Sequence, residues 1–144
     1  FTGVSLAPAI RELRPAGHAI AQRAAEEHLR AFGGTVADVD LVARVRREIA
    51  LRVGVEHALP DEREVARALG VTERTVRRHL DAAGTRFRAL VDAVLLATAA
   101  HYLRDSSLAV GDIAVRLGYG ESASFVRAFR RWTGETPHRF RTRR

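Results

Sequence analysis

Apolar residues recur at helical spacing along most of this 144-residue chain, and almost no stretch has the alternation of a strand. An early apolar stripe predicts a helix at about 15–32, which Gly33-Gly34 then ends. A second stripe predicts a helix at about 38–53, and a third predicts one of about 20 residues at 85–105. The pattern therefore predicts an all-α protein in which an extra N-terminal helix precedes the rest.

A short pattern, apolar-Ala-x-x-Leu-Gly-apolar, occurs at 65–71 and again at 113–119, and an arginine-bearing helical segment follows each copy. The small Ala lets two helices cross closely, and the Gly gives the backbone freedom for a short turn between them. We therefore predict two helix-turn-helix subdomains, at about 61–83 and 110–133, joined by the long linking helix. A helix of that length measures about 30 Å, close to the roughly 34 Å between successive major-groove faces of DNA.

The first predicted unit begins at Asp61, an expected N-cap with Glu64 in the capping-box position, and its first helix ends at Gly70. Thr72 is the expected N-cap of the next helix, which should turn its apolar side inward and its charged side outward. Inward lie Val76 and Leu80; outward lie Arg74, Arg77, Arg78 and Asp81. We predict DNA contacts from Thr72, Arg74, Thr75, Arg77 and Arg78. The alternative is that these arginines only form the solvated face of a surface helix.

The second predicted recognition helix, at about 121–133, has an aromatic stripe of Phe125, Phe129 and Trp132. Such a stripe is more typical of a core than of a platform for stacking bases. The DNA-contacting residues predicted on this helix are Ser122, Ala123, Ser124, Val126, Arg127, Arg130 and Arg131. Small side chains offer few of the two-point hydrogen bonds that distinguish one base pair from another. We therefore expect the first unit to carry most sequence discrimination.

Charge agrees with a nucleic-acid partner, since 24 basic against 17 acidic residues give a net charge of +7 and a pI near 11.3. Every basic residue is Arg, which suits paired hydrogen bonds to phosphate and guanine but equally fits a GC-rich coding bias. The excess belongs to the part after residue 40, where the two units lie. The arginine-rich tail, 139–144, is interpreted as either a frayed end or a phosphate clamp.

Other functions find little support in the sequence. It has no Cys, no catalytic serine or phosphate-binding glycine motif, and six His without ligand spacing, so we predict no enzyme, metal or cofactor. No apolar run is long enough for a membrane span and no export signal is recognisable, so a cytoplasmic location is expected. The remaining alternative is a non-specific, packaging-type DNA-binding protein.

Together, these motifs resemble the AraC/XylS-type transcription regulators over about residues 41–144. The strongest matches are Ile113-Ala114-x-x-Leu117-Gly118-Tyr119, then Ser124-Phe125-x-Arg127-Ala128-Phe129-Arg130, then Gly134-x-x-Pro137-x-x-Phe140-Arg141. The resemblance implies that the DNA-binding domain is 38–144 and that 1–37 is the tail of a sensor domain or a linker. It also implies double-stranded promoter DNA and RNA polymerase as partners, and a small-molecule effector only through a preceding domain. Because the chain begins at Phe1 and not at Met, we expect it to be a fragment of a longer protein. The resemblance implies dimerisation through the missing part, so we expect the fragment to be monomeric and the full-length protein to be able to dimerise.

Overall fold

The computed structural model describes residues 36–143 and consists of helices joined by short turns, with no strand in that part. The helix expected at 15–32 lies outside the described residues. The elements are α3 (Val36–Leu51), the π-helical turn η1 (Arg52–Glu56), α4 (Glu62–Ala68), α5 (Glu73–Ala82), α6 (Phe87–Asp105), α7 (Val110–Arg116), α8 (Ser122–Thr133) and α9 (Pro137–Thr142). The all-α prediction is confirmed, and η1 and α9 are additions to the elements that the sequence predicted.

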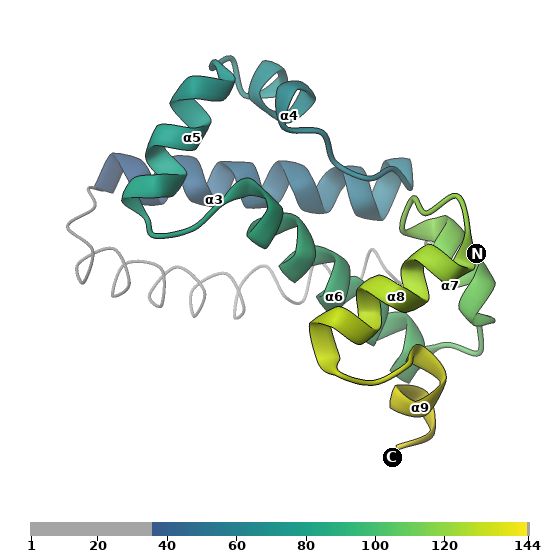
Figure 1. The fold of residues 1–144 in the computed structure, drawn as a ribbon. Coiled ribbons are helices and arrows are strands. Elements are labelled where there is room, and N and C mark those ends of the chain that lie inside the picture. Colours follow the sequence, from purple (N-terminus) through teal and green to yellow (C-terminus); the bar gives the residue numbers. More distant parts are fainter. Residues whose placement is uncertain (1–35, 144) are drawn as a thin grey trace.

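Two helix-turn-helix units lie at the two ends of α6 (Figure 1). In the first, α3 packs against α4, α5 and α6. In the second, α7 and α8 pack against each other and against α6, and α9 closes the end of the unit on α6 and α8. The predicted arrangement of two units on one linking helix is therefore confirmed.

One continuous core runs through both units. Val45 and Ile49 of α3 are fully buried in it together with Leu95 of α6. On the second unit, Phe129 packs edge-on against Phe125, with ring centroids 5.8 Å apart. The aromatic stripe of α8 is thus used for packing, as predicted, and its buried rings offer no surface on which a base could stack.

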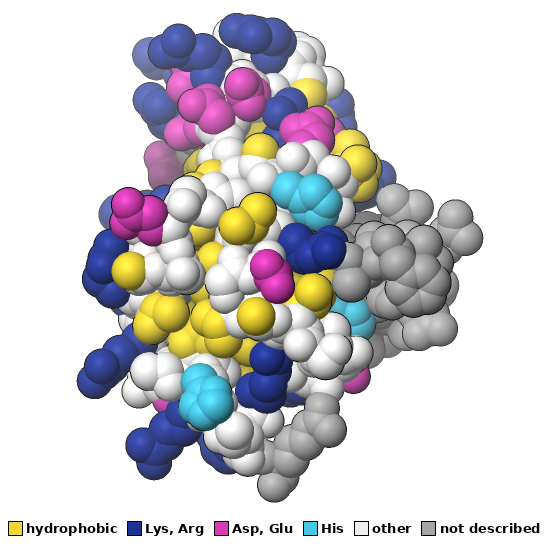
Figure 2. Space-filling model, turned by 90° about the vertical axis from the view of Figure 1, so that its right-hand side faces the viewer, with side chains coloured by type: hydrophobic (Ala, Val, Ile, Leu, Met, Phe, Trp, Pro, Cys, Tyr) yellow, Lys and Arg dark blue, Asp and Glu magenta, His cyan; other side chains and the backbone are white. Residues whose placement is uncertain are grey.

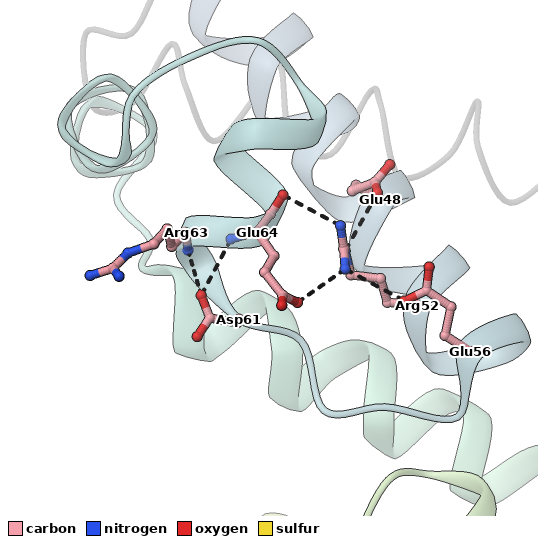
Figure 3. Close-up of polar contacts among 6 residues, drawn as sticks. All are labelled: Glu48, Arg52, Glu56, Asp61, Arg63 and Glu64. Carbon is pink, nitrogen blue, oxygen red and sulfur yellow. Dashed lines mark hydrogen bonds and ion pairs between the residues drawn. The ribbon is translucent and has the colours of Figure 1, made fainter.

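Arg52, the first residue of η1, joins the end of α3 to α4 (Figure 3). Its guanidinium lies 3.5 Å from Glu48, 3.5 Å from Glu56 and 3.2 Å from the Glu64 carboxylate. Asp61 caps α4 as predicted, since its carboxylate accepts hydrogen bonds from two amides of the first turn, at 2.8 and 3.3 Å. The capping-box role expected of Glu64 is corrected, because its carboxylate is occupied by Arg52 from another helix.

The arginine-rich tail forms the helix α9 as far as Thr142, so the expectation of a frayed end is wrong there, whereas the phosphate clamp stays a prediction. Thr136 caps α9, and Arg141 donates from Nε to the carbonyl oxygen of Leu103 at 3.1 Å. The terminal nitrogen of Arg141 lies 3.5 Å from the carbonyls of Tyr102 and Ser106. Leu103 lies in the last turn of α6, where carbonyls lack amide partners from the same helix, so the guanidinium caps that helix and complements its dipole.

A short segment after η1 connects the two units directly. His57 adopts a left-handed conformation, with φ of 53°, and its Nδ1 lies 2.9 Å from the carbonyl oxygen of Arg116 at the end of α7. Gly118, in the following turn, has a φ of 91°, and a Cβ there would lie only 2.5 Å from the Leu59 amide nitrogen. Gly118 therefore serves the turn and also admits the backbone of the first unit.

Candidate DNA-binding surface

The helix α5 begins where the sequence predicted, because Thr72 caps it. Its hydroxyl accepts a hydrogen bond from the Thr75 amide at 3.1 Å and lies 2.9 Å from the Thr75 hydroxyl. Val76 and Leu80 are buried, at 0% and 1% exposure. The opposite side is solvent-exposed as predicted and consists of Arg74, Arg77, Arg78 and Asp81.

Contacts with α3 hold α5 in a defined orientation. His79 Nδ1 forms a short contact with the carboxylate of Asp38, a buried residue at the beginning of α3. Arg44 of α3 donates to the carbonyl oxygen of Leu69, at the end of α4, at 3.2 Å. Neither contact could be predicted from a local pattern, since each joins residues far apart along the chain. Together they fix both helices of the first unit against α3.

The three outward arginines of α5 have different surroundings. Arg77 donates from Nε to Glu62 Oε1 at 2.9 Å, and its Nη2 lies 3.5 Å from Glu73 Oε1. The hydrogen bond with Glu62, and then the charges of Glu62 and Glu73, raise the pKa of Arg77 above its ordinary value. Within residues 36–143, the side chains of Arg74 and Arg78 form no ion pair.

Glu73 also faces Arg63 of α4, whose Nε lies 3.6 Å from Glu73 Oε2. The upper end of the molecule, where α4 and α5 lie in Figure 1, accordingly shows arginines interleaved with acidic side chains (Figure 2). This surface is therefore not uniformly basic. It combines the guanidinium groups of Arg74 and Arg78, which form no ion pair in the described part, with that of Arg77, which is hydrogen-bonded to Glu62.

On α8 the predicted residues divide by exposure. Ser122, Ala123, Arg127, Arg130 and Arg131 are exposed, whereas Ser124 and Val126 are half-buried. Arg127 donates to the Ser124 hydroxyl at 3.3 Å, which ties together two of the predicted contact residues. The inward stripe is confirmed by Phe125 and Phe129, both at 0% exposure, with Trp132 partly buried beside them.

Over residues 36–143, no three histidine or acidic side chains gather in a way that could hold a metal ion. No helix in the same range is long and apolar enough to cross a membrane.

Comparison with known proteins also identifies a helix-turn-helix domain in this chain. A family described as helix-turn-helix domain matches residues 65–143, a range that takes in α5 to α9 and both turns. The ornithine utilization regulator of Pseudomonas aeruginosa is 40% identical over 101 residues, which cover 70% of this chain and 29% of the regulator. The chain thus spans about three-tenths of the length of that relative.

Solved structures share the fold. The C-terminal domain of AraT, a response regulator from Geobacillus stearothermophilus, superposes with a TM-score of 0.65 at 26% identity, over 72% of this chain and 85% of that domain. The DNA-binding domain of AdpA, solved in complex with a target DNA, has a TM-score of 0.59 at 21% identity, over 69% and 90% of the two chains. With its two helix-turn-helix units on one linking helix, the chain belongs to the AraC/XylS-type family of transcription regulators.

Proposed function

We propose that this chain is the sequence-reading part of a transcription regulator and that α5 and α8 enter successive major-groove segments of promoter DNA. The observation that carries the proposal is the mounting of two recognition helices, each buried on one side and arginine-bearing on the other, at the two ends of α6. The 19 residues of α6 span roughly 28 Å, against the roughly 34 Å between groove segments. A modest bend of the DNA toward the protein would close the difference.

The first unit is the principal reader in this proposal. Its exposed arginines can make two-point hydrogen bonds to guanine or bind phosphates. Thr72 and Thr75, at the beginning of α5, would lie close to the sugar-phosphate backbone of the DNA. The second unit contributes phosphate contacts and register through Arg127, Arg130 and Arg131, while Ser122, Ala123, Ser124 and Val126 permit a close approach. Charged contacts of this kind fix position, and base-edge contacts specify sequence.

The intact protein would be built around this domain. We propose that 38–144 binds DNA and that 1–37 connects it to a preceding domain, through which a small-molecule effector acts. RNA polymerase would be contacted at the promoter, the DNA-binding part alone would be monomeric, and the protein would work in the cytoplasm. Family membership argues against a packaging role, which needs basic charge but no recognition helix after a turn.

The test is selection of binding sites from a randomised duplex pool at near-physiological salt. The wild-type chain is compared with an Arg77→Ala/Arg78→Ala variant and with Arg47→Ala, which removes an exposed arginine from α3, outside both recognition helices. We expect a motif with two half-elements about one helical turn, ~10 base pairs, apart. The double variant should blur one half, and Arg47→Ala should leave both intact.

Salt dependence separates the remaining possibilities. If several arginines engage phosphates together, affinity should fall on the order of a thousandfold over a fourfold rise in salt. Steep salt dependence without any recovered motif would indicate a packaging-type protein and contradict the proposal. A flat salt response would contradict the electrostatic argument itself.

A further inference from the structure

Arg77 forms ion pairs with two acidic side chains, whereas Arg74 and Arg78 on the same helix form none in the described part. Glu62, in the first turn of α4, accepts the Nε hydrogen at 2.9 Å, and Glu73 lies 3.5 Å from Nη2. The Arg77 side chain is 63% exposed, while that of Glu62 is only 20% exposed. The carboxylate of Glu62 is thus partly sheltered by the protein, and the guanidinium that it binds remains accessible to a ligand.

This arrangement determines which donors of Arg77 remain available. A guanidinium carries five N–H donors in a planar fork, and the bond from Nε to Glu62 uses the inner one. In the part of the chain that the structure describes, no hydrogen bond engages either terminal nitrogen of Arg77, although Nη2 forms the 3.5 Å ion pair with Glu73. Two terminal nitrogens form the pair of donors that matches the O6 and N7 acceptors of guanine.

The charges around Arg77 favour a base over a phosphate. Two carboxylates close to one guanidinium offset its attraction for a phosphate, which depends on net charge. Directional hydrogen bonds to the neutral edge of a base are retained. Arg74 and Arg78, whose charges are not offset by ion pairs in the described part, are better suited to the phosphates. A side chain already held in place also loses less conformational freedom on binding.

We infer that Glu62 is a positioning residue, which orients Arg77 so that its terminal nitrogens read a guanine in the half-element of the first unit. The inference rests on the proposed function and deepens it, because it assigns base reading to one arginine of α5 and gives a role to a residue outside the recognition helix. Glu73 acts with Glu62 to reduce the attraction of Arg77 for phosphate.

The experiment measures binding to the selected duplex and to duplexes in which each guanine of the first half-element is replaced in turn by adenine. The variants are Glu62→Ala, Glu62→Gln, Arg77→Ala and the double variant Glu62→Ala/Arg77→Ala. Glu64→Ala is the matched control, since Glu64 lies on the same helix but binds Arg52. Urea unfolding of each variant verifies that it is folded.

We expect Arg77→Ala to abolish the preference for one guanine and Glu62→Ala to lower it roughly threefold to tenfold, a part of what a two-point arginine–guanine contact provides. Glu62→Gln keeps an oxygen acceptor for Nε and should retain most of the preference. In the Arg77→Ala background, Glu62→Ala should have no further effect on it. Affinity for unrelated DNA should rise in both Glu62 variants, because a negative charge near the phosphates is removed.

Each other outcome overturns the inference in a recognisable way. If both Glu62 variants bind all duplexes more tightly with the guanine preference unchanged, Glu62 only weakens phosphate binding. If Glu62→Ala lowers the guanine preference by the same factor in the Arg77→Ala background as in the wild-type chain, Glu62 acts through another residue. If Arg77→Ala retains every preference, Arg77 is not the reader. Failure of the wild-type chain to select any motif would instead refute the proposed function, together with what rests on it.

Discussion

Replacing Gly118 by alanine tests whether the two units are held together by close backbone packing. The new Cβ would lie 2.5 Å from the Leu59 nitrogen and 2.7 Å from the carbonyl carbon of Ala58, where real Cβ contacts essentially never fall below 3.0 Å. Both neighbours are backbone atoms, so the segment itself must move away. Gly118 also has a φ of 91°, which an L side chain rarely adopts.

The cost has two parts. A side chain in the left-handed region costs about 1–2 kcal/mol, and overpacking of a close contact costs typically about 1–3 kcal/mol more. Gly118→Ala should therefore lower the free energy of unfolding by about 2–5 kcal/mol. Gly134→Ala is the matched control, because Gly134 has a similar φ of 83° but nothing within 4 Å of an added Cβ. Its cost should be about 1–2 kcal/mol.

Urea unfolding followed by circular dichroism measures both variants, with the midpoint and the slope fitted together. The difference between them isolates the contact between the units, since the two share the backbone strain. Equal costs for Gly118→Ala and Gly134→Ala would refute the reasoning and mean that the segment at 58–59 yields freely.

Three further predictions concern stability. Thr72→Ala should lower the unfolding free energy by about 1 kcal/mol, because the Thr75 amide loses its acceptor, and Thr72→Ser should restore it in urea unfolding. Phe129→Ala should cost about 3–5 kcal/mol by the same assay, since a fully buried ring is removed; a cost below 1 kcal/mol would contradict the packing described. Burial raises the pKa of Tyr102 and Tyr119, so the unfolded chain releases their protons first, and stability should fall as the pH rises above about 10. The urea midpoint of the wild-type chain should be lower at pH 11 than at pH 9, and the Tyr119→Phe variant should show a smaller decrease. An equal decrease in the variant would contradict a contribution from the buried Tyr119.

Much of the local structure could be predicted because its causes lie within a few residues of one another. The caps at Asp61 and Thr72 were identified from the residue type and the apolar pattern that follows, and the structure confirms both. The burial of Val76 and Phe125 followed from the 3.6-residue period, which is a property of the helix alone. The DNA contacts assigned to the exposed faces of α5 and α8 remain predictions.

Other features could not be predicted from the same reasoning. The residues at 139–142 have a sequence that fits a frayed end, and they fold into α9 because the end of α6 offers a carbonyl to Arg141. Glu64 satisfies the capping-box spacing, but Arg52 of another helix is a stronger partner for its carboxylate. In both cases the partner lies at a distance along the chain that no local pattern contains.

Residue types and their spacing were sufficient to predict where most helices begin and end, which face of each is apolar, and that two similar units are joined by one long helix. Those properties depend on residue type and on spacing within one or two turns. The ion pair of Arg77 with Glu62, and the close approach of the first unit's backbone to Gly118, arise only when the helices pack. These contacts depend on how helices cross in three dimensions, and a difference of one turn in that packing would have paired other side chains.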